Sequence, residues 1–139
     1  WKECLGVHVN LQSTEGKVYY DRLKHRDYQM GIGSWFADFR DPISFLEIFK
    51  LKENGTNNTQ WENSNYIALL DQSATTTNSL EREKFLKAAE KLIVQEMPVI
   101  PLFYASYNYV KKPSVKGVYF SELGYLDFKN AYLDNHPLQ

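Results

Sequence analysis

The sequence has little cysteine, no long apolar run and no excess of charge of either sign. Its single cysteine, Cys4, cannot form an internal disulfide. Because the neighbouring Glu3 and Leu5 do not activate a thiol, we expect Cys4 to be buried and structural. No apolar stretch is long enough to cross a bilayer. The 16 basic and 17 acidic side chains leave a net charge of -1, so the chain lacks the basic field that recruits nucleic acid or an anionic membrane surface.

Motifs of metal and nucleophile chemistry are missing as well. The 3 histidines lie far apart, without the spacing of a zinc site. There is no Gly-x-Ser-x-Gly, Cys-x-x-Cys or phosphate-binding glycine loop, so we expect no metal and no cofactor. One enzymatic alternative stays open, a hydrolase with a carboxylate pair chosen from Asp38, Asp41 and Glu47. Carboxylates in a loop are more often helix caps, as Asp41 before Pro42 would be.

What the sequence does contain is typical of one globular domain that is rich in aromatic residues. Of the 139 residues, 43% are hydrophobic and 24% are charged, which argues against disorder. The aromatic content of 15%, including 10 Tyr, is generous for a core alone, and Tyr and Trp also serve binding surfaces. Residues 1–6 are typical of the last turn of a helix closed by Gly6, so we expect the chain to begin inside a longer protein.

Hydrophobic periodicity predicts a mixture of strands and helices, in an order that favours an α/β fold. The clearest helix covers residues 80–95, where Asn78 can act as the cap and Glu81 follows three residues later. Shorter helices are predicted over residues 16–26, 43–50 and 66–72. Alternating apolar and polar side chains predict strands at residues 7–11, 29–34 and 102–107.

Asp38 has an unusual setting among the acidic residues. It follows a predicted strand and is flanked by Trp35, Phe36 and Phe39. Ligands of open α/β sheets gather beyond the carboxyl ends of strands. A carboxylate between aromatic side chains is costly unless it meets a cation. That cation belongs either to a Lys or Arg of the same chain or to a ligand.

Residues 35–42 have the sequence Trp-Phe-Ala-Asp-Phe-Arg-Asp-Pro. This run resembles the Trp-x-Ala-Asp-aromatic-x-Asp-Pro signature of the oligopeptide- and dipeptide-binding proteins of ABC importers, solute-binding protein family 5. Further segments resemble the family in the same order and spacing over nearly the whole chain, and the ordered set is far more specific than any one of them. These segments are residues 5–11, 68–71, 98–104 and 112–117.

The resemblance implies an α/β fold, namely the C-terminal lobe of a bilobed periplasmic-binding-protein (type II) fold, with a mixed sheet and flanking helices. Residues 1–111 would form the C-terminal-lobe segment, and residues 112–139 would return toward the N-terminal lobe. The other wall of the binding cleft would lie in that lobe, so the isolated chain would hold only one side of the cleft and could be a structural unit without activity of its own.

The same resemblance implies an extracytoplasmic protein, periplasmic or at the cell surface, that is not an enzyme. It would capture short peptides and deliver them to an ABC transporter permease. Asp38 would bind the peptide's α-ammonium, and Trp35, Phe36 and Ala37 would pair their backbone with the peptide and line the cleft. A cell-wall peptide, a nickel chelate or haem stays open as an alternative cargo. No nucleic-acid partner is expected, and a lipid anchor outside this chain would be its only contact with the membrane.

Overall fold

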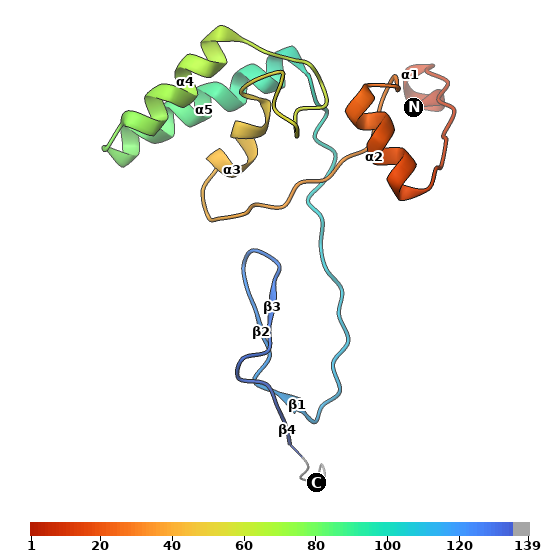
Figure 1. Cartoon of the computed structure of the whole chain (residues 1–139), viewed down its shortest axis with the longest axis vertical. Helices are drawn as coiled ribbons and strands as arrows, with labels where there is room; N and C mark the ends of the chain where they lie inside the picture. Colours follow the sequence, from red (N-terminus) through yellow and green to blue (C-terminus); the bar gives the residue numbers. More distant parts are fainter. Residues whose placement is uncertain (135–139) are drawn as a thin grey trace.

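The computed structural model describes residues 1–134. Figure 1 shows two groups of helices and, below them, small β-ladders reached through a long extended segment. None of the helices in the described part combines the length and the apolar character that a bilayer crossing requires. In chain order the elements are α1 (Lys2–Leu5), α2 (Gly16–His25), α3 (Ile43–Leu46), the 3-10 helix η1 (Glu47–Phe49), α4 (Ser64–Thr75), α5 (Ser79–Glu96), β1 (Val115–Lys116), β2 (Tyr119–Phe120), β3 (Leu126–Asp127) and β4 (Tyr132–Leu133).

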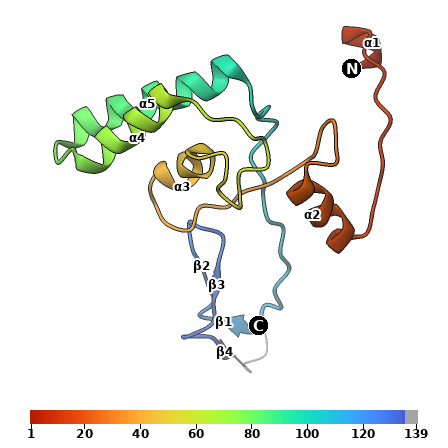
Figure 2. The same ribbon diagram turned by 45° about the horizontal axis from the view of Figure 1, so that its top comes forward.

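The hydrophobic core lies where α3, α4 and α5 meet. Helices α4 and α5 run side by side, and α3 packs against α5 (Figure 2). The most deeply buried large side chain is Tyr66, which is 0% exposed. Its hydroxyl donates a hydrogen bond of 2.6 Å to the carbonyl of Leu46, so the buried polar group is satisfied, and burial raises the pKa of Tyr66 well above its ordinary value. The core residues are Leu46, Tyr66, Leu70, Leu86, Ala89 and Ile93.

Helix α5 begins and ends where local sequence signals predict. The side chain of Asn78 accepts a hydrogen bond of 3.0 Å from the backbone N–H of Glu81, which satisfies one of the free donors of the first turn. At the other end, Met97 adopts a left-handed conformation with φ of 51°, and Pro98 cannot continue the helix. The predicted helix over residues 80–95 is confirmed.

The two N-terminal helices also agree with the sequence. Gly6 ends α1 with φ of 67°, a conformation that glycine adopts without strain, and Glu15 caps α2 with its side chain. A Cβ atom on Gly31 would lie 2.7 Å from the Cδ2 atom of Leu23, so a larger residue there would displace this buried side chain of α2. The prediction for Cys4 was wrong: it is exposed, because no side chain of the single turn α1 is buried.

The three predicted strands are not formed in the described part of the chain. Residues 7–11, 29–34 and 102–107 have no ladder partner, and Figure 1 shows the last of these segments running away from the helices as an extended chain. A strand needs a neighbour about 4.8 Å away to pair its N–H and C=O groups, and no ladder joins these segments. Alternation alone does not supply that neighbour, so the expected mixed sheet is absent from residues 1–134.

The C-terminal part instead forms two short antiparallel ladders. Strand β1 pairs with β4, so that Val115 lies opposite Leu133, and β2 pairs with β3, so that Phe120 lies opposite Leu126. The division into residues 1–111 and 112–139 stays a prediction, and its last five residues, 135–139, lie outside the described residues.

Candidate functional site

The segment that carries Asp38 is attached to the helical core through α3. The backbone N–H of Asp38 donates a hydrogen bond of 2.9 Å to the hydroxyl of Ser44, which is buried on α3. Asp41 accepts a hydrogen bond of 2.9 Å from the N–H of Ile43 at the start of the same helix. Because α3 contributes Leu46 to the core, the position of Asp38 is set by the best-packed part of the molecule.

Asp41 is a structural carboxylate. Its two oxygens each lie 2.9 Å from a terminal nitrogen of Arg82 on α5, in a bidentate pair. The hydrogen bonds from Arg82 hold the pKa of Asp41 below its ordinary value; partial burial opposes this effect, and the bond from Ile43 adds to it. Since this carboxylate is committed to Arg82, it is not a free partner for Asp38, and of the carboxylates considered for a hydrolase only Glu47 lies in the same hollow as Asp38.

The Asp38 side chain, by contrast, is exposed. Within residues 1–134 its carboxylate makes no hydrogen bond and no ion pair. The nearest basic residue in the sequence, Arg40, pairs with Glu122 at 2.8 Å instead. The hypothesis that Asp38 is matched by a Lys or Arg of its own chain is therefore not realised in the described part.

Asp38 borders a hollow of about 290 Å³, which we call the Asp38 hollow. The segment around Asp38 forms one wall, the loop that follows η1 forms another, and α3 and η1 supply the rest of the lining. The lining side chains are both apolar and polar, and two of them are acidic. They are Trp35, Asp38, Phe39, Ser44, Glu47, Ile48, Asn54 and Thr56.

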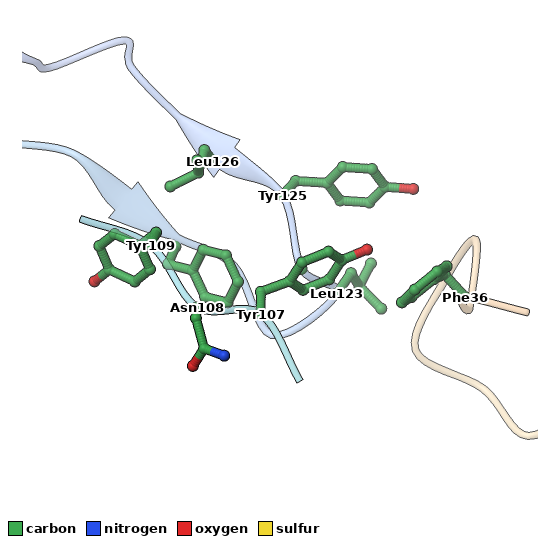
Figure 3. A pocket seen from close by; sticks show the side chains of 9 residues that line it. Phe36, Tyr107, Asn108, Tyr109, Leu123, Tyr125 and Leu126 are labelled. Carbon is green, nitrogen blue, oxygen red and sulfur yellow. The ribbon is translucent and has the colours of Figure 1, made fainter. Parts of the chain in front are cut away.

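A second hollow, of about 440 Å³, lies on the side of the β2–β3 ladder and is lined mainly by aromatic rings; we call it the aromatic hollow. Figure 3 shows Phe36 on its own segment, facing Tyr107 across this space. The rings of Phe36 and Tyr107 stack with centroids 5.5 Å apart, and those of Tyr109 and Phe120 stack at 5.7 Å. Such offset pairs add to the stabilisation from area burial.

The four predicted site residues do not share one hollow. Trp35 and Asp38 line the Asp38 hollow, Phe36 lines the aromatic hollow, and Ala37 is half-buried and lines neither. What residues 35–37 share is an open backbone: in the described part, none of their N–H and C=O groups makes a hydrogen bond. The segment is thus an unpaired edge that ends in an unpaired carboxylate.

Sequence reasoning missed Asn54 and Thr56 as lining residues, and it named Glu47 only as a member of a possible hydrolytic carboxylate pair. The runs Asn54-Gly55-Thr56 and Asn57-Asn58-Thr59 lie in the loop that follows η1. In the structure Asn57 is buried, and its side chain donates to the carbonyls of Leu51 and Trp61 at 3.1 and 3.0 Å. Two Asn-x-Thr turns in a short loop are the available signal, because Asn side chains hold the backbone that follows them.

Comparison with known proteins places the chain. It is 44% identical over 132 residues to the oligopeptide-binding protein OppA of Bacillus subtilis. The matched region covers 95% of this chain and 24% of that protein. It is 34% identical over 130 residues to the dipeptide-binding protein DppE of the same organism, covering 94% of this chain and 24% of the relative. Over the matched residues the chain is therefore similar to the oligopeptide- and dipeptide-binding proteins of solute-binding protein family 5. No family model matches it.

The fold agrees with this similarity. The structure of the pheromone receptor PrgZ, described as showing its mode of peptide binding, matches with a TM-score of 0.82 and 30% identity over 96% of this chain and 26% of the receptor. The described residues are consistent with a fragment of a lobe of such a protein. The chain spans about a quarter of the length of the relatives it matches.

Proposed function

We propose that the protein is an extracytoplasmic solute-binding protein that captures short peptides and delivers them to an ABC transporter permease. Its relatives carry the names of oligopeptide- and dipeptide-binding proteins, and they are binding proteins and not enzymes. The observation that carries the proposal is the exposed Asp38 carboxylate, which has no partner in the described part and stands next to the open backbone of residues 35–37.

This arrangement suits an extended peptide with a free amino terminus. The carboxylate of Asp38 would accept the α-ammonium, a charge-assisted contact that every unmodified peptide can make. The N–H and C=O groups of residues 35–37 would pair with the peptide main chain, which gives affinity without dependence on its sequence. The side chains of Trp35 and Phe36 would lie on opposite sides of the bound peptide, because each lines a different hollow.

Calorimetric titration of the full-length protein with short unmodified peptides tests this function. We expect saturable binding of intact peptides, and much weaker binding by an Asp38→Ala variant. Asp27→Ala is the matched control, because Asp27 is an exposed carboxylate near α2 that lines neither hollow. Chromatography of the peptide after incubation should show no cleavage; turnover by the purified protein would establish an enzyme in place of a carrier. Failure of all peptides, with binding of a chelate or of haem, would assign a different cargo.

A further inference from the structure

We infer that the Asp38 hollow receives the side chain of the peptide's first residue and that Glu47 makes it select a cationic side chain. The inference rests on the proposed function, since it takes the α-ammonium to be bound at Asp38.

The location follows from the covalent geometry of a peptide. The first side chain leaves the same α-carbon that carries the ammonium group, so an ammonium on Asp38 keeps that side chain within a few ångströms of this carboxylate. The Asp38 hollow opens there, whereas the aromatic hollow is lined from the same segment only by Phe36. Trp35 and Ile48 offer apolar surface against which the methylene groups of a long side chain can lie.

The charge of the lining gives the preference. Its charged residues are Asp38 and Glu47, and none is basic. The Glu47 side chain is exposed and makes no hydrogen bond or ion pair within the described residues. Lys50, one turn further on, does not neutralise it, because its amine lies 2.7 Å from the carboxylate of Asp71. With Asp38 occupied by the α-ammonium, Glu47 remains as an unmatched carboxylate in a hollow that Trp35 also lines, and an aromatic ring also favours a cation.

The polar residues of the opposite wall are already engaged. The side-chain oxygen of Asn54 accepts from both the N–H and the hydroxyl of Thr56, at 3.3 and 3.1 Å. The Asn54 amide donates in turn to the backbone carbonyl of Glu47 at 3.5 Å. These bonds hold the wall beside Glu47 in place and leave the Glu47 carboxylate as the group that distinguishes one first residue from another.

The test uses calorimetric titration of the full-length protein with three tripeptides that differ only at the first residue, which is lysine, norleucine or glutamate, followed by two alanines. We expect the wild-type protein to bind the lysine peptide about 3- to 10-fold more tightly than the norleucine peptide, as suits a partly solvated ion pair, and to bind the glutamate peptide most weakly. The preference for lysine should shrink as salt is added.

Variants assign the preference to one carboxylate. Glu47→Gln should bind the lysine and norleucine peptides equally, and Glu47→Lys should favour the glutamate peptide. Glu53→Gln, in the loop that follows η1 but not in the lining, should keep the wild-type order. Equal wild-type affinity for the lysine and norleucine peptides, or an unchanged preference in Glu47→Gln, would overturn this inference while peptide binding itself stands. Absence of binding by all three peptides would instead remove the proposed function, and this inference with it.

Discussion

Two regions of the molecule differ in how far their large apolar side chains are buried. They are the helical unit of α3, α4 and α5 and the extended segment of residues 98–114. The helical unit encloses Tyr66 and Leu70 almost completely. The extended segment exposes a row of large apolar side chains, among them Leu102, Phe103 and Tyr104. Contiguous apolar surface of this kind is usually covered in a soluble protein. The difference indicates that the packed core of the helical unit holds Asp38 in position. The exposed apolar side chains of the extended segment are the ones that we expect another surface to cover.

The largest expected effect is on the free energy of unfolding when one leucine in each region is replaced by alanine. In the 139-residue chain, Leu70→Ala should lower the free energy of unfolding by about 2–5 kcal/mol, because it leaves a cavity between α4 and α5. Leu102→Ala should change it by less than about 0.5 kcal/mol, because that side chain is exposed. Urea unfolding followed by the helical circular dichroism signal measures both.

Repeating the Leu102→Ala measurement in the full-length protein sharpens the comparison. If another part of the protein covers the extended segment, the cost should rise to about 2 kcal/mol or more. Equal costs of the two leucine substitutions in the 139-residue chain would show that the core is not confined to the helical unit.

Local signals explain why the helices were predictable and the strands were not. Asn78 and Gly6 set helix ends through contacts with residues a few positions away, so the sequence window contains everything that is needed. A strand at residues 102–107 depends on a partner that its own pattern does not specify. The side-by-side position of α4 and α5, with Tyr66 bonded to Leu46, also joins distant parts of the sequence and was not predicted.

A smaller effect is expected for the ion pair that fixes the turn after Asp38. Asp41→Asn should lower the free energy of unfolding by about 1–2 kcal/mol, because it weakens a bidentate, partly buried pair with Arg82. The matched change Asp27→Asn should cost about 0–0.5 kcal/mol, because the Arg22–Asp27 pair is mostly exposed. Similar costs in the same unfolding assay would contradict the special role of the Asp41–Arg82 pair.

The pH dependence of stability gives this pair a second readout. Because the pKa of Asp41 is lower in the folded than in the unfolded chain, the unfolded chain binds more protons in acid. The contribution of Asp41 is therefore fully present above its unfolded pKa of about 4 and is lost as the pH falls through the lower folded value. The stability difference between wild type and Asp41→Asn, measured by urea unfolding from pH 6 down to about pH 3, should shrink below about pH 4.

The smallest effect concerns the ion pair between the site segment and the turn that joins β2 to β3. Arg40, beside the site segment, pairs with Glu122 near the β2–β3 ladder, and both side chains are largely exposed. A double-mutant cycle of Arg40→Ala and Glu122→Ala should give a coupling of about 0–1 kcal/mol. A coupling well above this range would mean that this ion pair, and not only the aromatic ring contacts, holds the site segment against the ladder.

For the site, as for the fold, the sequence predicts what depends on neighbouring residues and does not predict what depends on distant ones. Asp38 stood out because a carboxylate among Trp35, Phe36 and Phe39 demands a cation, which is a local argument. Glu47 was named only as one member of a possible carboxylate pair, because its place in the Asp38 hollow depends on α3 and on the loop held by Asn57. The structural role of Arg82 was likewise hidden, since 41 positions separate it from Asp41.

The central claim is that Asp38 binds the amino terminus of a peptide, and a thermodynamic cycle on the full-length protein tests it most directly. A tripeptide with a free amino terminus and its N-acetylated form are titrated calorimetrically into the wild type and into Asp38→Ala. In a closed, water-poor cleft, acetylation should cost the wild type about 2–5 kcal/mol of binding free energy and should cost the variant little, so that the coupling lies in the same range. Equal affinity of the wild type for the free and the acetylated peptide would show that Asp38 is not the ammonium site.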